Sequence, residues 1–220
     1  MIKKLIYSIN VKGSGLILMI NTHRIMGENI LKYANSKSIY LINKKRFIWG
    51  NIKPDCTPKY KVKKHYYNES IDMIIDKIIY LSSLTLEEVY YDMKLGRFSE
   101  ELGVICHFLC DFFCAPHYYR WEFKSTNAVK QHMMYEQRLA KLCKNFRPTK
   151  LINTNINREN VRDFIESMQS QYDGIINYDN DLTFSYYVCD SVINMILNNV
   201  FSNKNIPAKD AMTYKSKVII

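Results

Sequence analysis

The sequence predicts an all-α fold, built as a single compact domain of several packed helices. Glycine and proline are scarce, at 7 and 5 residues in a chain of 220, which disfavours a turn-rich β architecture. Hydrophobic residues recur with a helical period along most of the chain. They also make up 47% of the composition, which excludes a disordered chain and suffices for a substantial core at this length.

The N-terminal part of the predicted domain contains two helical stretches and a long loop. Thr22 is placed to cap a helix from His23 to about Ala34, and a shorter helical stretch is predicted over residues 38–47. Helix-breaking residues then follow one another and indicate the loop: Gly50, Pro54 and Pro58. We expect this loop to carry Asp55 and His65.

The middle of the chain is predicted to contain the central helix of a bundle. One helix before it carries a stripe of isoleucines, at positions 71, 74, 75, 78 and 79. A second opens with the capping box Thr85–Glu88 and stops near Gly96. Ser99 is placed to cap the next helix, which is hydrophobic on nearly all sides from Leu102 to Phe113 and ends at Pro116. Such a helix is expected to lie in the centre of the bundle.

Three further helices complete the prediction, over residues 126–144, 159–171 and 181–200. The domain is predicted to span residues 19–200, with no internal repeat and no second domain. Residues 1–18 are interpreted as an N-terminal extension or a misassigned start, since Met19 is a natural place for such a chain to begin. Residues 201–220 are interpreted as a polar C-terminal tail.

The formal net charge of +10 indicates an anionic partner, such as phosphate esters, acidic lipid or nucleic acid. A biased genomic composition rich in Lys, Ile and Asn would give the same charge without any such partner. No basic run interleaved with aromatic residues stands out, which makes nucleic acid the less favoured partner.

The cysteines and the N-terminal segment favour a cytoplasmic over a secreted protein. Cys106, Cys110 and Cys114 recur every four residues along one helix, where they cannot pair with each other, and free thiols suit a reducing compartment. The hydrophobic run over residues 16–20 is too short for a signal-peptide core or a membrane span. We therefore expect no signal peptide and no transmembrane segment.

All five histidines belong to one pattern of metal-ligand spacing: His23, His65, His107, His117 and His132. His107 with Asp111, and His132 with Glu136, are four residues apart and so share a helix face. A His and an Asp on the hydrophobic central helix are costly to bury unless they are paired or bind a metal. Taken singly, a histidine is more often a packed or surface residue than a ligand. Together they predict a metal cluster between helices, with the imidazole and carboxylate ligands that zinc accepts in hydrolytic sites.

Over roughly residues 19–200 the chain resembles the zinc-dependent phospholipase C family, which includes bacterial phosphatidylcholine-preferring enzymes and the catalytic domain of clostridial α-toxins. The resemblance rests on the order and spacing of these residues: Thr22-His23, Trp49 to Asp55, His65, Gly103 to Asp111, Pro116-His117, and His132 with Glu136. The family is distantly related to single-strand-specific zinc nucleases. We expect no additional C-terminal lipid-docking domain of the α-toxin kind.

The resemblance implies three zinc positions. One would be held by Asp55, His65, His107 and Asp111, and a second by His117, His132 and Glu136. His23 and Asp111 would contribute to a third, which in the family is completed by the backbone of a processed N-terminal Trp. This sequence begins with Met1 and has no Trp before His23, so we expect two firmly bound ions and a third that is weak or absent.

The implied function is a phosphodiester hydrolase of phospholipase C type, in which zinc-activated water attacks the phosphorus of a phospholipid head-group ester and Asp55 acts as general base. A phospholipid or another phosphodiester is the implied substrate, with peripheral membrane contact compatible with it and the oligomeric state open. The alternatives are a zinc nuclease or nucleotidase on the same scaffold, and a metal-binding homologue with little catalysis. The residues that bind substrate are not assigned, because the nearby aromatic side chains fit either a cleft or ordinary packing: Trp49, Tyr118, Tyr119 and Trp121.

Overall fold

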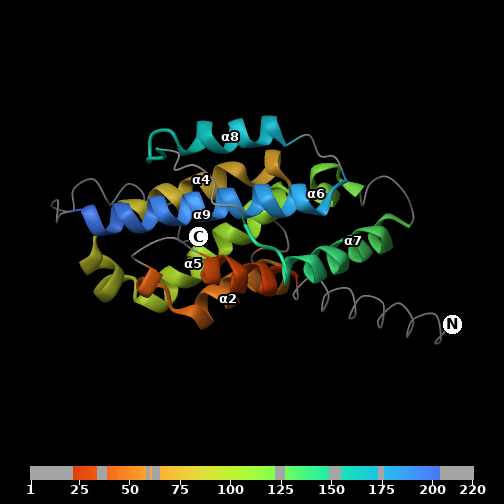
Figure 1. Ribbon diagram of the computed structural model, residues 1–220. Helices are drawn as coiled ribbons and strands as arrows, with labels where there is room; N and C mark the ends of the chain where they lie inside the picture. Colours follow the sequence, from red (N-terminus) through yellow and green to blue (C-terminus); the bar gives the residue numbers. More distant parts are fainter. Residues whose placement is uncertain are drawn as a thin grey trace.

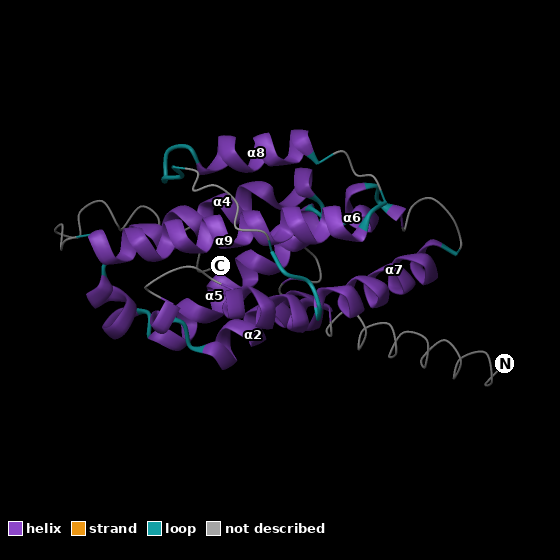
Figure 2. Cartoon of the chain, in the orientation of Figure 1, coloured by secondary structure: helices purple, strands orange, loops and turns teal. Residues whose placement is uncertain are grey.

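The computed structural model describes residues 22–33, 39–57, 60, 65–121, 127–148, 155–172 and 176–203. Over these residues the chain forms helices and no strand, as Figure 2 shows. The helices share one continuous hydrophobic core. The predicted all-α domain is therefore confirmed. The predicted N-terminal extension, residues 1–18, and residues 204–220 of the predicted tail lie outside the described residues.

A helix over residues 22–33 opens the described chain. The elements that follow it are η1 (Ile39–Leu41), α2 (Lys44–Cys56), α4 (Tyr67–Ser83), η2 (Glu88–Asp92), α5 (Leu95–Phe112), α6 (Ala115–Tyr118), α7 (Ala128–Cys143), α8 (Val161–Gln171) and α9 (Tyr178–Ser202). Helix α5 runs through the middle of the bundle, with α2 packed along one side of it and α4 and α9 on the other (Figure 1). Helix α8 packs on the outside of α9, and α7 extends at the end of the bundle where α6 lies (Figure 1).

Helix α5 is the buried centre that the sequence predicts, because every side chain from Leu102 to Phe112 is buried. Its start differs from the prediction. The helix begins at Leu95, so Gly96 lies inside its first turn instead of ending the preceding helix. Ser99 is also inside the helix, where its hydroxyl donates to the carbonyl oxygen of Leu95 at 2.7 Å and accepts from the backbone N–H of Asn43 at 2.8 Å. Ser99 thus connects α5 to the start of α2 instead of capping a helix.

The predicted loop around Gly50 and Pro54 is wrong, because α2 continues through both residues to Cys56. Glycine at position 50 serves close helix packing here. A Cβ on Gly50 would overlap the carbonyl oxygen of Glu100, and a Cβ on Gly103 would overlap that of Phe47. The two glycines therefore let α2 and α5 approach closely, and this packing outweighs the helix-breaking tendency of Pro54 near the end of α2. As a result Asp55 is held on a helix against α5.

The capping box and the three C-terminal helices agree with the structure, whereas the predicted roles of Thr22 and Pro116 are wrong. Thr22 is already helical, and its hydroxyl donates to the carbonyl oxygen of Glu136 instead of capping the helix. Helix α5 ends at Phe112, and Pro116 lies in the first turn of α6, where its missing N–H costs no helical hydrogen bond.

In the capping box, the backbone N–H of Glu88 donates to the Thr85 hydroxyl at 3.1 Å, and the Thr85 N–H donates to the Glu88 carboxylate at 2.9 Å. The three C-terminal helices begin and end within three residues of their predicted positions. All six cysteines are free thiols, and no helix among the described residues is long and apolar enough to cross a membrane.

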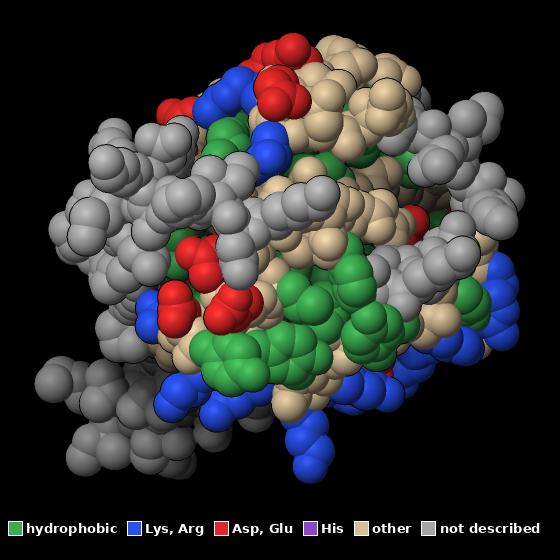
Figure 3. Space-filling model, turned by 90° about the vertical axis from the view of Figure 1, so that its left-hand side faces the viewer, with side chains coloured by type: hydrophobic (Ala, Val, Ile, Leu, Met, Phe, Trp, Pro, Cys, Tyr) green, Lys and Arg blue, Asp and Glu red, His purple; other side chains and the backbone are tan. Residues whose placement is uncertain are grey.

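One end of the bundle carries a cluster of exposed aromatic side chains. It is formed where η1, η2 and the last turn of α9 lie together: Tyr40, Tyr90, Tyr91 and Phe201. Figure 3 looks onto this end and shows hydrophobic side chains gathered above a border of Lys and Arg. Helix α5 starts at this end, and 12 residues separate Leu95 from His107, a distance of about 18 Å along the helix. The histidine cluster therefore lies toward the opposite end of the bundle.

The close crossing of α2 and α5 predicts that Gly103→Ala destabilises the protein strongly, by roughly 3 kcal/mol, because the added methyl group meets backbone on the facing helix. Gly96→Ala is the matched control, since its Cβ would lie 3.5 Å from the flexible Arg46 side chain. That substitution should be neutral or stabilise by up to about 1 kcal/mol, the helix-propensity difference. Urea unfolding of both variants measures the effect, and equal stability of the two would refute the packing argument.

Candidate metal centre

Four histidines converge on the carboxylate of Asp111, which is buried in the last turn of α5. Its Oδ2 atom lies 2.9 Å from Nδ1 of His65 and 3.2 Å from Nε2 of His107. Its Oδ1 atom lies 3.2 Å from Nε2 of His23 and 3.4 Å from Nε2 of His117. The four histidines come from four segments of the chain, so the two oxygens of one carboxylate face two different sets of nitrogen atoms.

Asp55, His65 and His107 form the first group of candidate ligands. Each offers one ligand atom, and these atoms all lie within 4.8 Å of one another. Oδ1 of Asp55 lies 3.8 Å from Nδ1 of His65 and 3.7 Å from Nε2 of His107. Oδ2 of Asp55 is buried and has no hydrogen-bond partner among the described residues. Oδ2 of Asp111 is also close to both of these histidines.

The ring of His107 is oriented by the backbone of α2. Its Nδ1 atom lies 2.8 Å from the carbonyl oxygen of Asn51, so Nδ1 carries the proton and donates it there. Nε2 is then left with a lone pair, directed at Nδ1 of His65 (3.2 Å) and at the Asp111 carboxylate. A histidine whose second nitrogen donates to a carbonyl is the usual arrangement of a metal ligand.

His117, His132 and Glu136 form the second group, with ligand atoms again within 4.8 Å of one another. His132 and Glu136 are four residues apart on α7, and Nε2 of His132 lies 2.7 Å from Oε1 of Glu136. Nε2 of His117, on the short helix α6, lies 3.4 Å from the same oxygen. The Thr22 hydroxyl donates to the backbone carbonyl of Glu136 at 3.2 Å, which joins α7 to the helix that carries His23.

His23, His107 and Asp111 form a third group that shares members with the first. The rings of His23 and His107 are tilted by 32° to one another, with centroids 3.8 Å apart. Because Nδ1 of His107 is bound to Asn51, only Nε2 is available for a metal, and one nitrogen lone pair binds one ion. The first and third groups therefore compete for His107.

The charges of the centre are set by burial and by the surrounding histidines. Burial opposes ionisation of Asp111, but His117, His107 and His23 outweigh it and hold the pKa of this carboxyl well below its usual range. His117 and His132 likewise outweigh burial and lower the pKa of Glu136. Burial and the neighbouring His23 lower the pKa of His107, so this imidazole is neutral at physiological pH. Ionised carboxylates and a neutral imidazole are the protonation states that bind a metal.

When no metal is bound, protonated histidines supply the positive charge of this centre. Burial disfavours protonation of His23, yet the Asp111 carboxylate outweighs burial and raises the pKa of His23 to about 10. The same carboxylate outweighs burial at His65 and raises the pKa of that ring. Several buried donor atoms nevertheless have no hydrogen-bond partner among the described residues: Nδ1 of His23, Oδ2 of Asp55, Nδ1 and Nε2 of His117, and Oε2 of Glu136. Clustered nitrogen and carboxylate donors with unsatisfied atoms fit zinc well.

A buried network around Asp181 positions the second group. Oδ2 of Asp181, on α9, accepts from the Tyr135 hydroxyl at 2.7 Å and from the backbone N–H of Ala115 at 3.1 Å. Its Oδ1 accepts from the Tyr172 hydroxyl at 2.6 Å, and burial raises the pKa of this carboxyl to about 6. Ala115 begins α6, two residues before His117, and Tyr135 precedes Glu136 on α7. Asp181 therefore fixes both helices that supply the second group.

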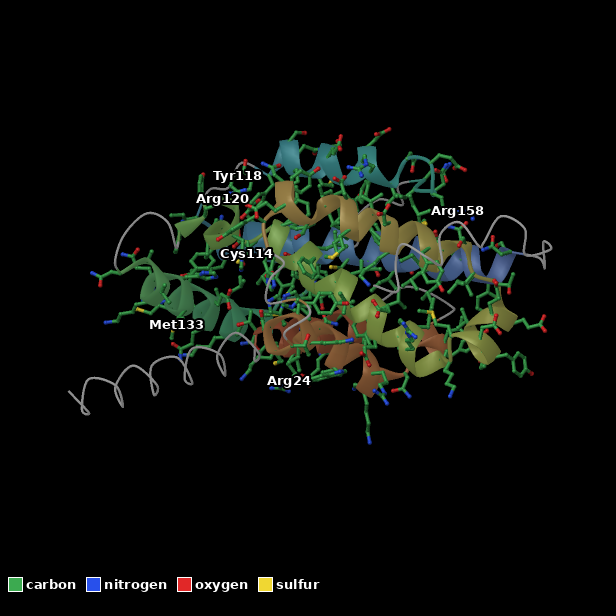
Figure 4. The ribbon with its side chains drawn as sticks, turned by 180° about the vertical axis from the view of Figure 1, so that it is seen from behind. Arg24, Cys114, Tyr118, Arg120, Met133 and Arg158 are labelled. Atoms are coloured by element: carbon green, nitrogen blue, oxygen red, sulfur yellow. The ribbon has the colours of Figure 1, made fainter. Side chains whose placement is uncertain are left out.

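A cavity of about 480 Å³ opens onto the centre, and Asp111 and His117 form part of its wall. Four aromatic side chains also line it: Tyr66, Tyr67, Phe112 and Tyr118. Figure 4 shows Tyr118 close to Arg120, another lining residue, at the end of the molecule that carries α6. The volume is in the usual range of small-molecule sites, about 300–1,000 Å³. The cavity thus gives a small polar ligand access to the histidine cluster.

All eight residues that the sequence nominates as ligands are brought together: His23, Asp55, His65, His107, Asp111, His117, His132 and Glu136. Of the aromatic residues considered for the cleft, Tyr118 lines the cavity, whereas Trp121 packs against Tyr135 with ring centroids 5.4 Å apart. Sequence reasoning missed Asp181 and Arg120. No spacing rule connects Asp181 to Tyr135 or Ala115, and Arg120 has no motif that marks it.

Comparison with known proteins gives a match to a family. The sequence model of a protein family described as zinc dependent phospholipase C matches residues 22–181, which contain every candidate ligand. No curated protein and no solved structure matches the chain significantly.

Removing zinc should lower the melting temperature strongly, since an ion that binds the folded chain and not the unfolded one stabilises the fold. An ion at 1,000 times its Kd adds about 4 kcal/mol of stability. At about 2–4 °C per kcal/mol, each ion removed should lower the melting temperature by roughly 8–16 °C. Thermal unfolding with zinc and with chelator measures this effect, and a melting temperature indifferent to chelator would exclude a structural contribution of metal.

The double variant His132→Ala/Glu136→Ala should lose one zinc per chain and keep the ion at Asp55, His65 and His107, because it removes two of the three ligands of the second group only. Elemental analysis after dialysis gives the zinc content. Gln131→Ala/Gln137→Ala, which alters two exposed side chains of the same helix, is the matched control. Loss of all zinc from the first variant would contradict the division into separate groups.

Proposed function

The chain belongs to the zinc-dependent phospholipase C family, and on this premise we propose that it hydrolyses the head-group phosphodiester of a phospholipid. The observation that carries the proposal is the Asp111 carboxylate, which joins two groups of metal-ligand side chains and also forms part of the wall of a cavity. The same residues thus hold metal and face the space that a substrate can enter.

We propose that Asp55, His65, His107 and Asp111 hold one zinc and that His117, His132 and Glu136 hold a second. A third ion at His23 and Asp111 is proposed to be weak, because His107 has a single free nitrogen and the first group also needs it. Zinc bound in this way supplies positive charge for the phosphate oxygens and lowers the pKa of bound water to about 7. The Asn51 carbonyl oxygen orients His107 directly, and the Asp181 carboxylate acts on the second group through Ala115 and Tyr135.

Asp55 is the proposed general base. Its Oδ2 atom is buried without a hydrogen-bond partner among the described residues, so it is available to accept the proton of the attacking water. Its Oδ1 atom faces His65 and His107, which keeps the carboxylate in place. Asp55 is not among the residues that line the cavity, whereas Asp111 and His117 are.

The net charge of the chain supports an anionic substrate. With a formal charge of +10, the protein attracts phosphate esters over distances of about the Debye length, roughly 8–10 Å at physiological salt. This long-range attraction favours an acidic phospholipid or another negatively charged phosphodiester. It does not by itself select a head group.

A second candidate function is a zinc nuclease or nucleotidase on the same scaffold. The observation that favours it is the aromatic lining of the cavity beside His117, since nucleic-acid bases stack on such rings. Hydrolysis of single-stranded oligonucleotides, assayed beside phospholipid vesicles at equal zinc, distinguishes the two functions. Faster cleavage of oligonucleotide than of any phospholipid would replace the first proposal with the second.

The general-base role predicts that Asp55→Asn lowers kcat by about 10²–10⁴-fold, because the amide keeps the volume of the side chain but cannot accept the proton. Folding should be affected far less, as judged by the melting temperature in the presence of zinc. Asp72→Asn is the control, since Asp72 is an exposed carboxylate on α4 paired with Arg162. A turnover rate in Asp55→Asn equal to that of the control would exclude the assigned role.

A further inference from the structure

Arg120 is held at the cavity by three independent contacts. Its guanidinium lies over the ring of Tyr66, 4.5 Å from the ring centroid. Its Nη1 atom is 3.0 Å from Oε1 of Glu69, which does not itself line the cavity. The backbone N–H of Arg120 donates to the carbonyl oxygen of His117 at 3.1 Å. The residue is thus tied directly to the segment that carries a candidate ligand.

The backbone of Arg120 is in the left-handed region, with a φ of 50°. Glycine or asparagine adopts this conformation more easily, so an arginine here is maintained against a backbone preference. Strained residues of this kind gather at ligand sites, where the side chain is needed. At this position the side chain lines a cavity that reaches Asp111 and His117.

Apart from Asp111, His117 and the tyrosines, the polar residues that line the cavity beside Arg120 are uncharged: Asn68, Gln169 and Ser170. Gln169 donates its amide N–H to the carbonyl oxygen of Phe112 at 2.7 Å, which leaves its amide oxygen as an acceptor. Ser170 donates to the carbonyl oxygen of Ser167 at 2.8 Å, so its own oxygen also serves as an acceptor. Arg120 offers further N–H donors. Acceptors and donors placed together suit hydroxyl groups, which both donate and accept.

A quaternary ammonium group fits the Tyr66 side of this cavity poorly. Among the described residues that line the cavity, Asp111 is the only carboxylate, and it is engaged by four histidines. The ring of Tyr66 already lies under the guanidinium of Arg120, so a second cation on that face would meet like charge. The same contact keeps a nucleic-acid base from stacking on that face.

We propose that the cavity binds a hydroxyl-rich head group, such as inositol or glycerol, with Arg120 as the specificity-determining residue that favours net negative substrates over choline-bearing ones. The proposal rests on the proposed hydrolysis for its biological use, because it names the substrate class of that same site. Head-group binding itself does not depend on turnover. The phosphate lies against the Asp111 and His117 wall, and the polyol extends toward Arg120, Gln169 and Ser170.

The test is equilibrium binding of inositol 1-phosphate and of phosphocholine to the zinc-loaded full chain, by titration calorimetry. Inositol 1-phosphate should bind at least tenfold more tightly than phosphocholine. Arg120→Gln should remove most of this preference, with a loss of roughly 10- to 100-fold in affinity for inositol 1-phosphate, as expected for a charged hydrogen bond. Arg120→Lys should retain part of it. Zinc content should stay the same in both variants, which distinguishes loss of recognition from loss of structure.

Arg162→Gln is the matched control, because Arg162 is a partly exposed arginine paired with Asp72 and lies outside the cavity lining. It should bind both ligands as the natural protein does. Equal or tighter binding of phosphocholine, or an unchanged preference in Arg120→Gln, would overturn the inference. Hydrolysis of phosphatidylinositol and phosphatidylcholine vesicles is measured separately. Absence of turnover there counts against the proposed function, while the binding preference still decides the role of Arg120.

Discussion

The structure depends on keeping one carboxylate ionised at the centre of a helical bundle. Asp111 is 2% exposed on the most deeply buried helix of the chain, and an isolated charge there would cost several kcal/mol. Four histidines surround it at 2.9–3.4 Å and hold it in its charged form. Those histidines come from four separate segments. The centre can therefore assemble only when the helices that carry these residues are packed together.

The supporting contacts explain how a helical bundle holds such a centre in a defined geometry. The glycine pair Gly50 and Gly103 brings α2 close enough to α5 for the Asn51 carbonyl to orient His107. Asp181 fixes the start of α6 and the middle of α7 from the opposite side. The cavity then opens onto the face that these contacts leave uncovered. Rigid helices, and not loops, position most of the candidate ligands.

The fold class, the central helix and the pairs His107/Asp111 and His132/Glu136 could be predicted from the sequence, because burial and i,i+4 spacing are properties of the local pattern. The place of Asp55 and His65 beside them came only from the family resemblance. The prediction from the sequence failed at α2. Gly50 and Pro54 are typical helix-breaking residues, but in the folded chain both lie buried inside this helix. The prediction that Ser99 caps a helix was wrong for the same reason, because its hydroxyl connects α5 to the start of α2. Asp181 and Arg120 act through partners distant in sequence, which no single-sequence pattern encodes.

The most direct test of the central claim is anomalous diffraction at the zinc absorption edge from crystals of the zinc-loaded protein. The account predicts a peak about 2.0–2.2 Å from an Asp111 oxygen, with His65, His107 and Asp55 completing its ligands. A second peak should lie among His117, His132 and Glu136. If no peak lies within bonding distance of Asp111, or if zinc binds only outside these residues, the account of Asp111 as the shared ligand is contradicted.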